Sequence, residues 1–143
     1  MKIKLILTLL IIINILTTSC QVFTIKARKI VEESNAVYTQ STSIGSVKIF
    51  TTELQNENYF AAVDLMLKEN GEQLTATEKY DMINDLSRMK RYIEGKTLKK
   101  EIETIDTILG RYVVIYEYEN GNKSIFFTIE KNKLFYIVNY QRE

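Results

Sequence analysis

The sequence predicts an α+β domain in which N-terminal helices pack on one face of a curved antiparallel sheet of about four strands. Two observations lead to this prediction. Up to Gly95, apolar residues recur at spacings of three and four, as they do on one face of a helix. Beyond Gly95 the period falls to two, and Val, Ile, Tyr, Phe and Thr become frequent, as in strands.

The first helix is expected over residues 25–38, where apolar residues recur with modest amphipathicity. The polar run 39–43 then indicates a linker, with Ser43 as the N-cap of the next helix. Apolar residues then mark one face of a helix, the polar run 56–58 interrupts it, and apolar residues at helical spacing continue until Gly71. This pattern predicts two helices, or one helix with a kink, with Gly71 as the C-terminal cap. The residues of this face are Val47, Phe50, Leu54, Phe60, Val63 and Leu67.

A further helix is predicted to begin at Thr75, because Thr75 and Glu78 have the spacing of a capping box. An apolar stripe follows, and Gly95 ends the helix. The stripe consists of Met82, Ile83, Leu86, Met89 and Ile93. Such a stripe normally faces the core, so it indicates fold rather than function.

A meander of strands fills the rest of the chain, beginning with a strand at about 98–108. Asn120 and Gly121 predict a type I′ hairpin turn, and Lys131 with Asn132 the next turn. These turns give a predicted core face made of Tyr112, Val114, Tyr116, Ile125, Phe127, Ile129, Leu134, Tyr136 and Val138. The outer face would carry Val113, Ile115, Phe126, Phe135 and Ile137 beside Glu117, Thr128 and Asn139.

That outer face is more apolar than a fully solvated sheet face. Something is therefore expected to cover it. The candidates are a homodimer partner or another protein on the one hand, and the N-terminal helix of the same chain on the other.

The first twenty residues have the pattern of an exported precursor. Lys2 and Lys4 precede an apolar run from Leu5 to Leu16. This run has only 12 residues, whereas a membrane-spanning helix needs roughly 20. Residues 1–19 are therefore predicted to be a cleaved signal peptide.

Residues 16–20 read Leu-Thr-Thr-Ser-Cys and resemble the bacterial lipobox, although Thr17 stands where Leu is most common. The resemblance implies that Cys20 becomes the acylated first residue of the mature protein, with acyl chains such as palmitate as its membrane anchor. An ordinary leader with a coincidental cysteine is the alternative. Cys20 is the only cysteine, and lipidation accounts for an unpaired thiol in an exported protein.

Three segments follow from these patterns: the signal peptide at 1–19, a lipidated N-terminus with helix and linker at 20–43, and the α+β domain at 44–143. The expected location is the cell envelope. Residues 21–23 lack the acidic run that resembles a surface-export signal, which favours attachment facing the periplasm. In a single-membrane bacterium the same anchor would face outward.

Composition excludes several classes of function. Cleavage at Cys20 leaves 17 basic and 18 acidic residues, so nothing in the charge favours a nucleic-acid partner. The chain has no histidine, and acylation would consume its one thiol. Triads of the Ser-His or Cys-His kind, zinc sites and histidine-ligated haem are thereby excluded, and no cofactor or metal is predicted.

The order and length of the elements over residues 44–140 look like the cone-shaped, cystatin-like domains similar to nuclear transport factor two, which occur in small bacterial envelope lipoproteins. The segment 58–67, the turn at Gly71 and the capped helix resemble the helical half of that cone, and residues 111–140 resemble its last three strands. The resemblance implies a pocket between sheet and helices, used by some members for catalysis and by many for binding or assembly. No catalytic residue carries over.

The predicted function is that of a non-catalytic lipoprotein domain that binds a small apolar ligand, a peptide or another envelope protein. Four tyrosines at the end of the sheet have two possible roles: they line the mouth of a pocket, or they only pack at the edge of the hydrophobic core. These residues are Tyr112, Tyr116, Tyr136 and Tyr140. The alternative is an enzyme of the steroid-isomerase kind, with tyrosines and a buried carboxylate such as Asp64 or Asp106. The basic clusters at 26–29 and 88–91 indicate solvated surface or contact with anionic lipid.

Overall fold

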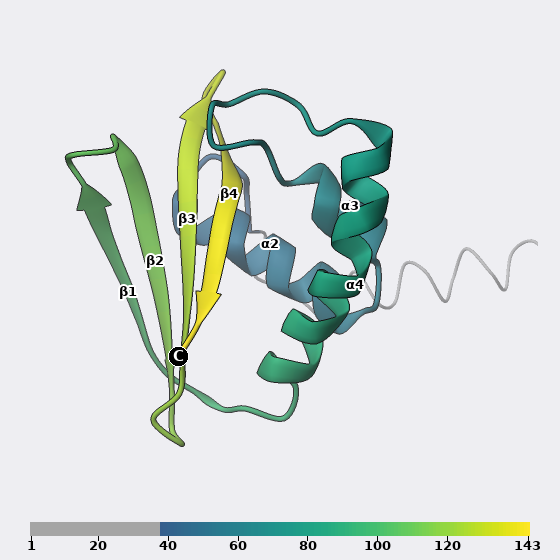
Figure 1. Cartoon of the computed structure of the whole chain (residues 1–143). Coiled ribbons are helices and arrows are strands. Elements are labelled where there is room, and N and C mark those ends of the chain that lie inside the picture. Colours follow the sequence, from purple (N-terminus) through teal and green to yellow (C-terminus); the bar gives the residue numbers. More distant parts are fainter. Residues whose placement is uncertain (1–37) are drawn as a thin grey trace, which may run out of the picture. The chain divides into compact units, whose positions relative to one another are not determined.

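The computed structural model describes residues 38–143, which form an α+β unit (Figure 1). Its elements in chain order are α2 (Ser43–Gln55), α3 (Tyr59–Asp64), α4 (Ala76–Ile93), β1 (Leu98–Asp106), β2 (Arg111–Tyr118), β3 (Lys123–Lys131) and β4 (Leu134–Arg142). Two sequence predictions lie outside the described residues: the signal peptide at 1–19 and the acylated Cys20. The helix predicted over 25–38 lies outside them too, except for Tyr38. Within residues 38–143, no helix is long and apolar enough to cross a membrane.

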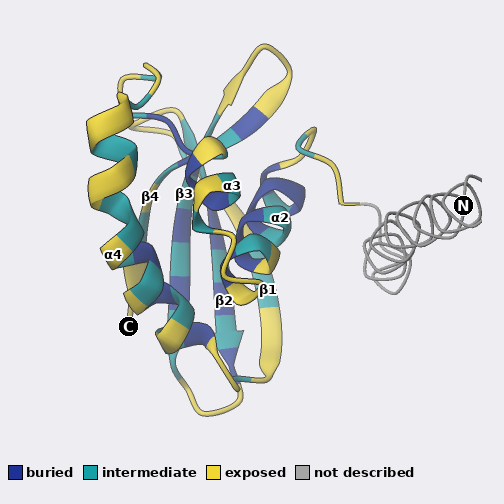
Figure 2. Cartoon of the chain, turned by 90° about the vertical axis from the view of Figure 1, so that its right-hand side faces the viewer, coloured by how far each residue is buried: buried dark blue, intermediate teal, exposed yellow. Residues whose placement is uncertain are grey.

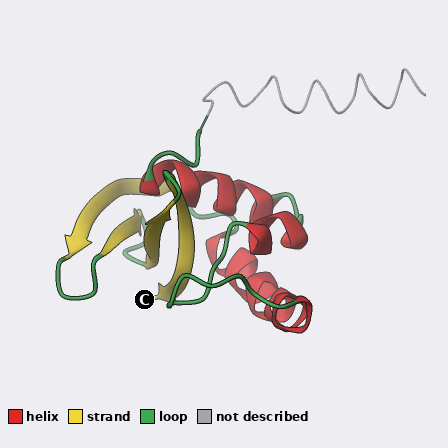
Figure 3. Ribbon diagram, turned by 90° about the horizontal axis from the view of Figure 1, so that it is seen from above, coloured by secondary structure: helices red, strands yellow, loops and turns green. Residues whose placement is uncertain are grey.

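The predicted fold class is confirmed. Four antiparallel strands pair in the order β1-β2-β3-β4, and the three helices pack on one face of this open sheet (Figure 1). Seen from above, the strands curve and the helices lie to one side of them (Figure 3). This face is called the inner face below, and the opposite one the outer face.

Helix α2 begins one residue earlier than predicted. Thr42, not Ser43, is the N-cap, and its Oγ1 accepts the Gly45 N–H at 3.0 Å. A side chain at position 45 would place its Cβ 2.1 Å from the Thr39 carbonyl oxygen, so the entering chain requires glycine there. The Gln40 carbonyl accepts the Phe135 N–H at 2.7 Å, which makes residues 39–42 part of the folded unit rather than a free linker.

The break at residues 56–58 is confirmed, but α3 is shorter than the spacing predicted. It ends at Asp64, because the next residues pair with the edge of β4. The Leu67 N–H donates to the Ile137 carbonyl at 2.9 Å, and the Ile137 N–H donates to the Leu65 carbonyl at 3.0 Å. Leu67 is therefore buried as an extended residue, and Phe60 is 62% exposed instead of facing the core.

Helix α4 confirms the predicted capping box. The Glu78 N–H donates to Thr75 Oγ1 at 3.3 Å, and the Thr75 N–H donates to Glu78 Oε2 at 2.7 Å. A hydrogen bond from Lys68, together with those at Thr75, lowers the pKa of Glu78 to about 2. The helix ends before Gly95, whose φ of 70° fits the predicted C-terminal stop. Leu86, Met89 and Ile93 are buried, while Met82 and Ile83 are half-buried.

The predicted register of β2 and β3 is wrong by one residue. Of the two residues predicted for the turn, Asn120 and Gly121, only Gly121 has a positive φ, 86°. A type I′ turn needs positive φ at both central residues. The Tyr118 N–H donates to the Asn122 carbonyl, so the loop has three residues and ends with a glycine in the left-handed region. The next loop has the two-residue form, with positive φ at Asn132 and Lys133.

Because a one-residue slip turns every side chain of a strand over, the predicted core face is only partly right. Val114 pairs with Phe126, and a bulge between Phe127 and Thr128 in the pairing with β4 lets Ile137 and Tyr140 both face inward. The residues predicted for the core that lie on the outer face are Ile125, Phe127, Ile129, Leu134 and Tyr136. Those predicted for the outer face that lie on the inner one are Phe126, Thr128, Phe135 and Ile137.

Aromatic contacts join α2 to the inner face of the sheet. The Phe50 ring packs 6.1 Å from both the Phe126 and the Tyr140 rings, and Tyr116 lies 5.5 Å from Phe126. Buried residues of the helices face the sheet, and exposed residues lie on their far side (Figure 2). The core therefore lies between the three helices and β2, β3 and β4.

The outer face remains apolar with the corrected residues, and half-buried Ile115, Ile125 and Phe127 lie at its centre. The Arg111 guanidinium lies 4.2 Å from the centre of the Phe127 ring and covers part of it. Coverage of this face by a second copy, by another envelope protein or by the N-terminal helix stays a prediction.

We expect Phe50→Ala to lower the free energy of unfolding by about 3–5 kcal/mol, because it leaves a cavity beneath two aromatic rings. Urea denaturation measures the change. Phe60→Ala is the matched control, since that ring is exposed and its loss should change stability by less than about 0.5 kcal/mol. Equal effects of the two substitutions would contradict the described position of α2.

Candidate functional site

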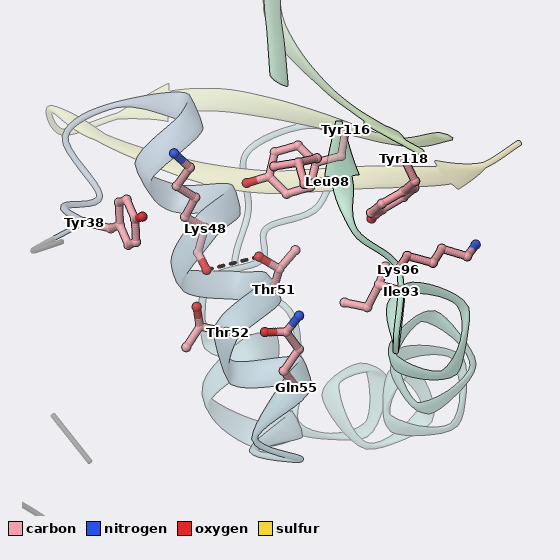
Figure 4. Close-up of a pocket in the computed structure, with 10 residues that line it drawn as sticks. All are labelled: Tyr38, Lys48, Thr51, Thr52, Gln55, Ile93, Lys96, Leu98, Tyr116 and Tyr118. Carbon is pink, nitrogen blue, oxygen red and sulfur yellow. Dashed lines mark hydrogen bonds between the residues drawn. The ribbon is translucent and has the colours of Figure 1, made fainter. Parts of the chain in front are cut away.

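A cavity of about 210 Å³ opens between α2, the C-terminal end of α4 and the first two strands (Figure 4). It is the candidate site. Its walls combine aromatic rings, aliphatic side chains, hydroxyls, an amide and two lysines. The lining residues are Tyr38, Lys48, Thr51, Thr52, Gln55, Ile93, Lys96, Leu98, Tyr116 and Tyr118.

Each wall comes from a local regularity of the chain. Lys48, Thr52 and Gln55 recur at helical spacing and form a polar stripe on α2, next to its buried apolar stripe. Tyr116 and Tyr118 are two residues apart in β2 and therefore share the inner face. Residues 93–98, which link α4 to β1, close the remaining side.

Tyr116 is the unusual residue of this cavity. The residue is only 6% exposed, and its hydroxyl makes no hydrogen bond of normal length and angle, although Glu101 and Thr51 lie close enough to interact with it. Glu101 is its partner in the pairing of β1 with β2, and the buried Oε2 of Glu101 likewise has none. Burial raises the pKa of the Tyr116 phenol well above its usual range, and the nearby Glu101 carboxylate raises it further. A buried hydroxyl without a partner costs about 1–3 kcal/mol.

The polar groups around Tyr116 are bonded within the protein. The Tyr118 hydroxyl lies 3.0 Å from Ser124 Oγ, and Thr51 Oγ1 donates to the Val47 carbonyl at 2.9 Å. Lys48 Nζ lies 3.2 Å from Glu101 Oε1. Near the cavity, the buried side-chain atoms that lack a well-formed hydrogen bond are therefore the Tyr116 hydroxyl and Glu101 Oε2, while Thr128 Oγ1 on β3 is a third such atom in the described residues.

Lys96 adds a cation beside the cavity. Its ammonium lies 3.1 Å from the centre of the Tyr92 ring and 5.3 Å from that of Tyr118. Desolvation by these rings lowers the pKa of Lys96. In Figure 4 its ammonium points away from Tyr116, so its aliphatic stem, rather than its charge, faces the cavity.

The four tyrosines predicted for the pocket mouth are not together. Only Tyr116 lines the cavity. Tyr112 is on the inner face and packs edge-on against Phe135 with centroids 5.0 Å apart, and the Tyr140 hydroxyl donates to Asp85. Tyr136 pairs with Ile129 on the outer face, because the corrected register turns it away from the helices.

Neither carboxylate suggested for acid–base chemistry is buried in a cavity. Asp64 is exposed and pairs with Lys79. Asp106 pairs with Arg111 and accepts two backbone N–H groups, which lower its pKa. Across residues 38–143, no three His, Cys, Asp or Glu side chains come together as a metal site would require.

The basic cluster at 88–91 lies on α4, where Arg88 and Arg91 are exposed. Between them Lys90 pairs with Glu57 at 3.1 Å and with Glu94 at 2.8 Å. Paired and solvated charges of this kind fit the interpretation as helix surface. The cluster at 26–29 lies outside the described residues.

Sequence reasoning missed most of this cavity. The polar stripe of α2 was visible as Lys48, Thr52 and Gln55 at spacings of four and three. Tyr118 lies two positions after Tyr116, so the sequence also indicates that both side chains are on the same face of the strand. No sequence pattern indicated Glu101, because its position beside Tyr116 depends on how β1 pairs with β2.

Comparison with protein-family models, with curated proteins and with solved structures found no match to this chain. The resemblance to the nuclear-transport-factor-two-like domains therefore stays a prediction. The function proposed for the cavity therefore rests on the geometry of the cavity alone.

We expect Tyr116→Phe to raise the free energy of unfolding by about 1 kcal/mol, because it removes a buried hydroxyl that has no partner. Tyr118→Phe is the matched control. It should lower the free energy of unfolding by about 1 kcal/mol, since it leaves the buried Ser124 without its tyrosine. Both values come from urea denaturation, and destabilisation by Tyr116→Phe would mean that its hydroxyl is satisfied.

Proposed function

We propose that this chain is a membrane-anchored lipoprotein of the bacterial cell envelope. Its domain is non-catalytic and binds a small molecule in the cavity at Tyr116. The observation that carries the binding proposal is the buried Tyr116 hydroxyl, which makes no well-formed hydrogen bond within the protein. A group of this kind is destabilising by itself and becomes favourable when a ligand bonds to it.

The chemistry of the walls supports a particular class of ligand. Among the wall residues, Tyr116 can donate one hydrogen bond and accept another. Ile93, Leu98 and the tyrosine rings offer apolar contact. A neutral molecule with an apolar ring and at least one hydroxyl satisfies both. The volume of about 210 Å³ is below the 300–1,000 Å³ typical of pockets for drug-sized ligands, which favours a small ligand.

The proposed anchor rests on residues 16–20 and on the pattern of the residues before them. A leader at 1–19 would deliver Cys20 for acylation, and two or more acyl chains would hold the domain stably at the membrane. The side that we favour is the periplasmic one. A partner on the outer sheet face is compatible with this function, because the cavity opens on the inner side.

An enzyme of the isomerase kind remains the alternative. It needs a carboxylate inside the cavity, within reach of a bound molecule. Glu101 is the nearest candidate, but it is not one of the ten lining residues, and its Oε1 is paired with Lys48. Binding without catalysis agrees better with this arrangement.

Phenol and toluene test the cavity, because they share a ring and a size but differ in the hydroxyl. We expect phenol to shift the amide NMR signals of the cavity walls and to bind more tightly than toluene. Tyr116→Phe should weaken phenol binding about fivefold, the equivalent of one lost hydrogen bond, and leave toluene unaffected. Tyr112→Phe is the control outside the cavity, and equal binding of both probes by the wild type would contradict the proposal.

The anchor is tested by intact mass and membrane fractionation of the wild type beside Cys20→Ala, in a bacterium that processes lipoproteins. We expect the wild type to lose residues 1–19, gain acyl mass and sediment with membranes. Cys20→Ala should show none of the acyl mass. Identical behaviour of the two proteins would refute lipidation.

A further inference from the structure

The turn between β1 and β2 exposes large apolar side chains. Ile108 is 92% exposed and Leu109 is 61% exposed at its tip, and Ile105 is exposed just before it. We call these three residues the apolar turn. Single exposed apolar residues are common on protein surfaces, but three within five positions at one protruding tip form a patch.

The apolar turn is held in a fixed conformation. Asp106 Oδ1 accepts the N–H groups of Ile108 and Leu109 at 3.1 and 3.2 Å, and Oδ2 accepts from Arg111 Nε at 3.3 Å. Gly110, with a φ of 62°, completes the turn. Two backbone N–H groups of the turn are therefore satisfied locally, while the side chains of Ile108 and Leu109 are exposed.

The position of this turn is informative. It lies at the same end of the sheet as the β3–β4 turn, opposite the end that holds the C-terminus (Figure 1). The β3–β4 turn adds the exposed Lys131, Lys133 and Leu134. Gln40 also bonds to Phe135 at this end, and Phe135 packs on Tyr112 at the start of β2.

The distance to the anchor position is limited by the covalent chain. The 18 peptide units from Cys20 to Tyr38 reach at most roughly 60 Å when fully extended. This reach exceeds the roughly 30 Å length of a nine-residue strand, so a lipid on Cys20 would allow this end of the sheet to reach the bilayer surface.

We infer that the apolar turn inserts into the lipid surface to which the protein is anchored, with Lys133 meeting anionic headgroups. This inference rests on the proposed anchor. A bilayer accepts apolar side chains at its headgroup boundary without requiring a matching shape, and nearby lysines are attracted to anionic lipid. A protein partner is less suitable, because a stable interface buries about 800 Å² on each side and three side chains on a narrow tip supply far less.

The chain contains no tryptophan, so one introduced residue gives an unambiguous fluorescence signal. The chain from Cys20 onward, with Ile108→Trp, is coupled through the Cys20 thiol to a maleimide lipid in vesicles of phosphatidylethanolamine and phosphatidylglycerol. Chemical coupling makes the measurement independent of lipidation in the cell. Failure of the anchor in cells and failure of the apolar turn are therefore separate results.

We expect the emission of Ile108→Trp to shift to the blue on the vesicles and to be quenched by doxyl groups on the lipid chains. Tyr80→Trp is the control, since Tyr80 is 71% exposed on α4 and should stay in water. Adding Leu109→Asp to Ile108→Trp should reduce the quenching at least threefold. Equal signals from positions 108 and 80 would overturn the inference, as would protection of position 108 from aqueous iodide without quenching by doxyl lipid.

Discussion

The three-residue loop at 119–121 determines which side chains of the last three strands face the helices. Gly121 alone adopts the left-handed conformation, and Tyr118 closes the loop on Asn122. The resulting register places Val114 opposite Phe126 and leaves Ile115 opposite Ile125 on the other face. The contact of Phe50 with Phe126, and therefore the position of α2, depends on this register.

The cavity and the core share their walls. Tyr116 packs on Phe126 in the core and is also one of the residues that line the cavity beside α2. Thr51 and Leu54 occupy neighbouring turns of the same helix, one lining the cavity and the other buried in the core. A site of this kind is preorganised, because moving its polar groups would require repacking of aromatic residues.

Sequence reasoning succeeded where the signal is local. The capping box at Thr75, the end of α4 before Gly95 and the break at residues 56–58 all depend on a few neighbouring residues, and the structure confirms them. It failed where two nearly equal local solutions exist. Asn120 and Gly121 suit a two-residue and a three-residue loop alike, and both strands of the hairpin are apolar on both faces, so hydrophobic alternation cannot decide the register.

For the candidate site, one of four predicted tyrosines was correct for the cavity. Tyr116 has the same orientation in both registers, whereas Tyr136 depends on the pairing that was predicted wrongly. The helical side of the cavity was readable in principle. The position of Glu101 was not, since it depends on the long-range pairing of β1.

The segment around Leu67 has a consequence for how copies of this protein behave near one another. By bonding to Ile137 it occupies the edge of β4 with the protein's own backbone, so no foreign strand can join the sheet there. In the described part of the chain β1 has no further strand beside it, and this open edge carries Lys99, Lys100 and Glu101. Charges on an edge strand oppose extension by another sheet. The part of the β4 edge at Ile137 and the edge of β1 are thus both unfavourable places for another strand to pair, which opposes strand-to-strand polymerisation.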